Sequence, residues 1–347
     1  MDVTLRERTT PARLERHLDR LTRRRRSLGA PQIALRGPDQ AFTYGDQNRA
    51  FHAASVGKLF TGAIILQLAA AGRLDIESRV DALLPSATLA GLFRTDAPAP
   101  TVLDLLQHYS GAADYFEGHR GTSVLSELQA HPERAWTPAE LLDFSREHLR
   151  PVGRPGERFH YSDTGFVLLG LIVEEVTGRR YDQAVHEQII EPLGLTRTFL
   201  PGLTSPAEGD ATLAPIWIGT QELSTAAGLT CAWAGGGIAS TPGDLLTFSE
   251  ALHGGRLVTP EHLTLMATPR GRLRGGIHYG AAMMELRFEG FSPVLRGRAR
   301  PLGHLGSTGT SLFYDPSSGA HLAMNFHARR ELPRLIRTAI AIQSAVG

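Results

Sequence analysis

The sequence has only one cysteine and only one lysine. Cys231 has no second cysteine to pair with, which excludes an internal disulfide and fits a reducing compartment. Lys58 is the only lysine among 36 lysine and arginine residues. Arginine keeps its proton in proteins, whereas lysine can release it. The single lysine therefore marks a position where the loss of a proton matters.

Long apolar runs and a strong net charge are also missing. The longest apolar stretch, residues 62–72, is interrupted by Gln67 and is too short to span a bilayer. No apolar segment of the secretory type follows the early positive charges. A net charge of +1 provides no field that would gather nucleic acid or membrane. We therefore expect a cytoplasmic protein that binds neither.

Several common catalytic signatures are absent as well. No Gly-x-Ser-x-Gly elbow occurs, which argues against an α/β-hydrolase. The 14 histidines show neither a His-Glu-x-x-His pattern nor a cluster with cysteine, and no phosphate-binding loop is present. We therefore expect no metal site and no cofactor.

Local patterns predict both strands and capped helices. The first 26 residues carry nine arginines against four acids, and their spacing from about residue 8 predicts a solvated amphipathic helix, with a polybasic arm as the alternative. A hairpin is expected at residues 32–35 and 41–44, and a helix buried on nearly all sides at residues 55–71. Further predicted elements are helices starting after Thr137 and Thr241, a helix at 164–176, a strand at 321–327 and a final helix at about 330–345.

The most informative tetrapeptide is Ser55-Val56-Gly57-Lys58. Residues three apart on a helix lie on one face, so the spacing brings the amine of Lys58 beside the hydroxyl of Ser55. Ser55 stands where the apolar helix begins, and backbone N–H groups there favour developing negative charge. The pattern predicts a serine nucleophile with Lys58 as its proton acceptor. A salt-bridged or snorkelling lysine at a helix start is the structural alternative.

Two further segments carry groups that fit this chemistry. Tyr161 and Asp163 lead into the second apolar helix, and a phenol near an amine can relay a proton. A core aromatic with a satisfied hydroxyl is the alternative for Tyr161. Residues 303–309, Gly-His-Leu-Gly-Ser-Thr-Gly, have the small side chains of a strand edge that lets a substrate approach the backbone.

Together and in this order, these segments resemble the superfamily of class C β-lactamases, D,D-peptidases and serine esterases, the penicillin-recognising serine hydrolases. Connecting phrases at residues 106–111, 161–178, 191–195 and 235–241 extend the resemblance over most of the chain. It implies an α/β fold of the α+β type, with an antiparallel sheet flanked by helices. It also implies one catalytic domain, residues 1–347, with an α/β lobe at about 1–75 and 231–347 and an inserted all-helical lobe at about 76–230.

The resemblance also implies roles for individual residues. Ser55 attacks a substrate carbonyl, Lys58 and Tyr161 share the proton, and water hydrolyses the acyl-enzyme. The backbone N–H groups of Ser55 and Ser307 form the oxyanion hole. The residues expected to support the site or bind substrate are Asp163, His304, Gly306 and Ser307.

Two positions depart from the family pattern. Asp163 stands where the family usually has asparagine, and its carboxylate favours the charged amine, so the base is either Lys58 or Tyr161. His304 replaces the lysine of the Lys-Thr-Gly motif, and Leu305 replaces its hydroxyl residue. A neutral imidazole attracts a carboxylate less than an ammonium does, which counts against efficient β-lactam hydrolysis.

The expected function is that of a cytoplasmic esterase or amidase acting on small acyl substrates. A D-amino-acid peptidase, a D,D-carboxypeptidase or a weak β-lactamase is the first alternative. A binding or sensor module that keeps the fold without turnover is the second. The expected partner is a small ester, amide or lactam, and the oligomeric state is left open.

Overall fold

The structure is a computed structural model and describes residues 11–25, 28–119 and 121–346. Residues 8–10 and Arg26 of the predicted N-terminal helix lie outside the described residues, and the rest of that prediction is confirmed by α1. The helices are α1 (Pro11–Arg24), α2 (Lys58–Ala70), α3 (Ser86–Leu89), α4 (Val102–Leu106), α5 (Val124–Ala130), α6 (Pro138–His148), α7 (Asp163–Thr177), α8 (Tyr181–Val185), α9 (Glu191–Leu193), α10 (Trp233–Gly236), α11 (Pro242–His253), α12 (Pro260–Ala267) and α13 (Leu332–Val346).

The main sheet has eight antiparallel strands in the order β2-β1-β12-β11-β10-β9-β8-β7. Its strands are β1 (Gln32–Arg36), β2 (Ala41–Tyr44), β7 (Gly271–Arg274), β8 (Ile277–Tyr279), β9 (Met284–Leu286), β10 (Leu302–Gly306), β11 (Thr310–Asp315) and β12 (Ala320–Asn325). Two short pairs complete the strands: β3 (Phe51–His52) with β6 (Ala239–Ser240), and β4 (Trp217–Ile218) with β5 (Gln221–Glu222). This sheet, flanked by helices, confirms the predicted fold class.

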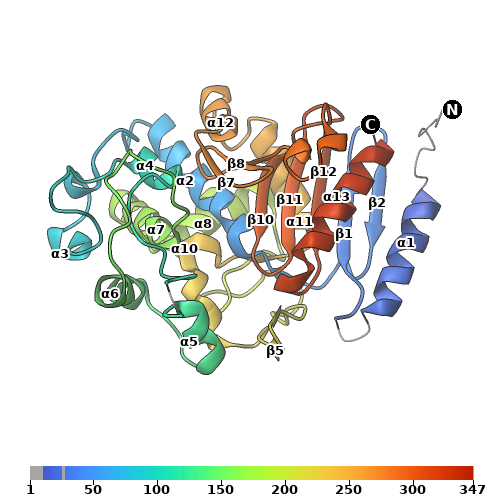
Figure 1. Cartoon of the computed structure of the whole chain (residues 1–347), viewed down its shortest axis with the longest axis horizontal. Coiled ribbons are helices and arrows are strands. Elements are labelled where there is room, and N and C mark those ends of the chain that lie inside the picture. The colour runs from blue at the N-terminus through green and yellow to red at the C-terminus, as the bar shows by residue number, and fades with distance from the viewer. Residues whose placement is uncertain (1–10, 26–27, 120, 347) are drawn as a thin grey trace.

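The sheet is buried on both faces because its side chains alternate between two cores. On one face, Ala34, Leu312 and Ala323 join the large core that contains α2, α7 and α11. On the other face, Ile33 and Met324 pack with residues of α1 and α13. Figure 1 shows α1 and α13 at the end of the molecule that holds β1 and β2, and α3 to α7 at the opposite end.

Local sequence signals place the helix ends. Thr137 caps α6 through a capping box with Glu140, and Thr241 caps α11 by accepting the backbone N–H of Asp244. The helix α7 ends at Gly178, whose φ of 68° is the left-handed conformation that glycine adopts without strain. The predicted hairpin is confirmed by the pairing of β1 with β2.

One predicted boundary is moved by the structure. Residues 54–57 form a single 3-10 turn, and the α-helix α2 begins at Lys58 rather than at Ser55. Burial of α2 on nearly all sides is confirmed, since Gln67 is the first of its side chains that is only half-buried. Ser55 therefore lies in the tighter 3-10 turn directly before the buried helix.

Within the described ranges, no helix combines the length and the apolar character that a membrane span needs. The division into two lobes near residues 76 and 231 stays a prediction.

Candidate active site

Ser55 lies half-buried on the 3-10 turn that precedes α2. The segment before it is held from two sides, because Ala53 N–H donates to Ile238 O and Ala53 O accepts from Thr310 Oγ1. Ala54 has a φ of 51°, in the left-handed region that a residue with a Cβ rarely adopts. Strained backbone of this kind persists only where surrounding contacts enforce it, and it is common at functional sites.

Lys58 is fully buried and its amine has three hydrogen-bond acceptors. Its Nζ lies 3.4 Å from Ser55 Oγ and 2.5 Å from the carbonyl oxygen of Gly235, and it also donates to Asp163 Oδ1. Three acceptors match the three protons of an ammonium group. The predicted proximity of Ser55 and Lys58 is thus present.

Tyr161 lies over the same amine, with its ring centroid 5.0 Å from Lys58 Nζ. Burial raises the pKa of Tyr161 well above its usual value, and the charge of Asp163 raises it further. A hydrogen bond with the Ser55 side chain has the opposite effect on this pKa. The structure therefore brings Tyr161, Ser55 and Lys58 together, with the phenol protonated at rest.

Asp163, the first residue of α7, is itself positioned by a second carboxylate. The buried Asp114 accepts the backbone N–H of Asp163 at 2.9 Å through Oδ1 and that of Glu117 at 3.0 Å through Oδ2. Burial, and then the charge of Asp163, raise the pKa of Asp114 to about 7, against the opposing effect of these backbone bonds. The acid that binds Lys58 is therefore held in place by a second acid.

The glycine run at residues 235–237 packs against the catalytic candidates. A Cβ at Gly235 would lie 2.8 Å from Asp163 Oδ1, and a Cβ at Gly236 would lie 2.7 Å from the carbonyl oxygen of Ala54. Real Cβ atoms do not approach so closely, so only glycine lets this backbone supply the carbonyl that binds Lys58.

His304 is fully buried in β10 and is fixed by two hydrogen bonds. Its Nδ1 lies 2.7 Å from Leu305 O and its Nε2 lies 3.1 Å from the hydroxyl of Tyr279. A carbonyl can only accept, so Nδ1 carries the hydrogen and Nε2 accepts. Burial lowers the pKa of His304 to about 3, and the ring is neutral. His304 is not among the residues that line the pocket at Ser55, although its ring centroid lies 6.4 Å from that of Tyr161. Its role in substrate binding stays a prediction.

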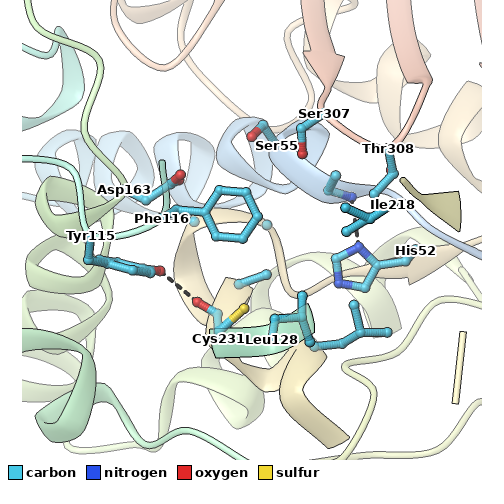
Figure 2. A pocket seen from close by; sticks show the side chains of 15 residues that line it. His52, Ser55, Tyr115, Phe116, Leu128, Asp163, Ile218, Cys231, Ser307 and Thr308 are labelled. Atoms are coloured by element: carbon cyan, nitrogen blue, oxygen red, sulfur yellow. Dashed lines mark hydrogen bonds between the residues drawn. The ribbon is translucent and has the colours of Figure 1, made fainter. Parts of the chain in front are cut away.

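Gly306 and Ser307 follow His304 at the end of β10. A Cβ at Gly306 would lie 2.7 Å from Ala53 O, so the small residue lets the strand end pack directly on the nucleophile segment. Ser307 lines the same pocket as Ser55, and Figure 2 shows the two serines next to each other. The oxyanion hole assigned to their backbone N–H groups stays a prediction.

A narrow pocket with a cavity volume of about 40 Å³ opens beside Ser55. Its lining includes Ser55, Ser307, Gly235 and Gly236. Most of the exposed surface inside it is apolar, and Phe116, Leu128, Ile218 and Leu229 contribute to it. Groups of three or more histidine, cysteine or acidic side chains placed to hold a metal ion do not occur in the described part of the chain.

Sequence reasoning missed two polar residues of this site. Asp114 is 49 residues from the backbone group that it binds, and nothing in its immediate sequence indicates that contact. His52 lines the pocket three residues before Ser55 and was not singled out, because an isolated histidine in a strand carries no functional pattern.

The chain is similar in sequence to a known protein family and to a curated relative. Residues 32–346 match a family model described as Beta-lactamase. Penicillin-binding protein 4 of Amycolatopsis lactamdurans is 31% identical over 163 residues, which are 46% of this chain and 37% of that protein. The chain thus spans little more than a third of that curated relative.

Two solved structures are similar over most of the chain. A D-stereospecific amidohydrolase from Streptomyces sp. has a TM-score of 0.74 and 29% identity, covering 88% of this chain and 92% of the other. A D-amino acid amidase from Ochrobactrum anthropi SV3 has a TM-score of 0.74 at 22% identity, covering 95% of this chain and 98% of the other, and shows the shared fold.

Proposed function

The chain belongs to the Beta-lactamase family of serine hydrolases, and from this we propose that it hydrolyses small esters or amides through an acyl-enzyme on Ser55. The observation that carries the proposal is the placement of Ser55 Oγ 3.4 Å from the fully buried amine of Lys58, at the mouth of a pocket. A hydroxyl and a base within reach of each other are what nucleophilic catalysis by serine requires.

Acylation follows from this geometry. The neutral form of Lys58 takes the proton of Ser55 as Oγ bonds to the substrate carbonyl carbon, and the carbonyl oxygen becomes an oxyanion. When the intermediate collapses, the bond to the leaving group breaks and the proton passes from Lys58 through Tyr161 to that group. Attack by water then releases the acid and returns the proton to Ser55.

Lys58 and Tyr161 are the two groups that could accept the proton of Ser55. Lys58 Nζ donates hydrogen bonds to Asp163 and to Gly235 O, and an amine acts as a base only in its neutral form. Tyr161 is hydrogen-bonded to the Ser55 side chain, and its raised pKa keeps the phenol protonated at rest. We assign the base to Lys58 and the relay to Tyr161.

An uncharged acyl group fits the pocket better than a carboxylate. Asp163 lines the pocket, and its partner Lys58 already has three acceptors. His304 is neutral and points its nitrogens at Tyr279 and Leu305 instead of at the pocket. These features support an esterase or amidase rather than an enzyme that anchors the carboxylate of a β-lactam.

A D-amino-acid amidase is the second candidate. The 29% identity to the D-stereospecific amidohydrolase, over 88% of the chain, favours it. The cytoplasmic setting and a sensor role without turnover stay predictions from the sequence.

Intact-mass measurement after treatment with a fluorophosphonate and with penicillin tests the acyl-enzyme. We expect one fluorophosphonate adduct in the wild type and none in Ser55→Ala, with Ser86→Ala, an exposed serine at the start of α3, as the matched control. Rates on nitrophenyl esters, D- and L-alanyl anilides and nitrocefin then separate the candidates. A lasting penicillin adduct without turnover would support the sensor, and no adduct at Ser55 would end every acyl-enzyme model.

A further inference from the structure

His52 presents a buried hydrogen-bond donor to the pocket. Its side chain is 4% exposed, and its Nδ1 lies 3.2 Å from the backbone N–H of Ala54. Because that backbone group can only donate, Nδ1 is the acceptor. Burial lowers the pKa of His52 to about 4, so the ring is neutral near pH 7 and its one hydrogen is on Nε2.

This Nε2–H group has no acceptor among the described residues. Figure 2 shows the ring across the pocket from Tyr115 and Asp163, with its second nitrogen turned away from the dashed bond. Buried polar groups in proteins are almost always hydrogen-bonded, and one that is not has an explanation in strain or in a ligand.

Thr308 provides a second polar group of the same kind. It is 7% exposed, lines the pocket, and its Oγ1 also lacks a partner in the part of the chain that the structure describes. Figure 2 shows Thr308 and His52 on the same side of the pocket. The wall around them includes Ile218 and Leu128.

We propose that His52 and Thr308 form an acyl-binding subsite for an uncharged group that carries a hydrogen-bond acceptor, such as an ether or carbonyl oxygen. This inference rests on the proposed function. The acceptor is uncharged because neither His52 nor Thr308 provides a positive charge for an anion, and because His52 Nε2–H cannot bind a cationic donor. The apolar wall accepts the carbon chain on either side of the oxygen.

The experiment compares nitrophenyl alkanoates with ether analogues in which oxygen replaces one acyl methylene at successive chain positions. The readout is the ratio of kcat/KM for the best ether to that for its methylene parent. We expect His52→Phe to lower this ratio at least about tenfold relative to the wild type, because the site loses its buried donor. His52→Gln should keep part of the preference, since its amide still donates.

Thr308→Val tests the same subsite without disturbing the bond between His52 and Ala54, and should lower the ratio in the same direction. The matched control is His321→Phe, which removes a buried histidine bonded to Ser249 outside the pocket and should leave the ratio unchanged. The inference is overturned if a folded His52→Phe or Thr308→Val variant keeps a ratio within about twofold of the wild-type ratio. If the wild-type protein is not labelled by the fluorophosphonate, the acyl-enzyme itself is contradicted instead.

Discussion

Lys58 Nζ donates a hydrogen bond to Asp163 Oδ1, and the two residues are 105 positions apart in the sequence. The lysine side chain is inaccessible and that of Asp163 is 12% exposed. Removing two charges from water is costly. Loss of one partner would leave the other charge buried without compensation and would destabilise the folded protein. This ion pair therefore couples the folding of the nucleophile segment to that of α7.

A double-mutant cycle measures that coupling. Lys58→Met keeps an unbranched side chain but leaves the Asp163 carboxylate buried without its partner. We expect a loss of about 3–5 kcal/mol in the free energy of unfolding, and recovery of at least half of it when Asp163→Asn is added. Urea denaturation provides the values, and equal losses in the single and double variants would contradict a buried ion pair. Neither variant should be acylated on Ser55.

Tyr161→Phe tests the proton relay without removing the ring above Lys58. We expect kcat to fall by about 10²–10⁴ while KM changes little, because only proton transfer is lost. The control is Tyr314→Phe on β11, a tyrosine that stacks on His253 and does not line the pocket. Near-normal kcat in Tyr161→Phe would reassign the relay to another group.

Asp114 makes the stability of the protein depend on pH near neutrality. Its pKa of about 7 in the folded state exceeds the usual 3.8, so the native state holds this proton more tightly than the unfolded chain does. The stabilising contribution is complete below about pH 4 and is lost as the pH rises through about 7.

Asp114→Asn cannot titrate and removes that dependence. Between about pH 4 and 8, we expect the free energy of unfolding of the wild type to fall relative to the variant by on the order of 4 kcal/mol. Any constant offset from the changed hydrogen bonds cancels in this comparison. Denaturant unfolding at several pH values gives both curves, and parallel curves would show that Asp114 is charged at all of them.

Gly235→Ala tests the close contact behind the amine. Its Cβ would lie 2.8 Å from Asp163 Oδ1 and 3.5 Å from Lys58 Nζ, so either the backbone or the ion pair must move. We expect kcat/KM for nitrophenyl esters to fall at least about tenfold, since misplacement by about 1 Å is enough for such a loss.

Gly243→Ala is the matched control for this substitution. It lies in the first turn of α11, where the nearest atom to a new Cβ is Thr241 Oγ1 at 4.0 Å. Alanine has a higher helix propensity than glycine, so that variant should be slightly more stable. It should also be fully active, because the new Cβ meets no close neighbour. Wild-type rates in Gly235→Ala would show that the contact is not needed for catalysis.

The sequence was sufficient for features that depend on neighbouring residues. The hairpin of β1 and β2, the threonine caps of α6 and α11 and the glycine end of α7 follow from turn and cap chemistry over a few positions. The proximity of Ser55 and Lys58 follows from their spacing of three, even though the segment begins as a 3-10 turn.

Features that depend on distant chain segments were not predictable in the same way. The contact of Asp114 with Asp163 arises only when the loop after α4 meets the start of α7. The role of Gly235 as an acceptor for Lys58 depends on the pairing of β3 with β6, which draws the two segments together. His304 matched a family position by sequence, yet its burial against Tyr279 is a property of the folded sheet.

The complete burial of Lys58 has a practical consequence because it is the only lysine in the chain. Reagents that acylate side-chain amines find no other lysine, and they reach this one only when the molecule opens around it. The rate at which Lys58 is modified should thus report how often the interior beneath the nucleophile becomes exposed, in protein that carries no added probe.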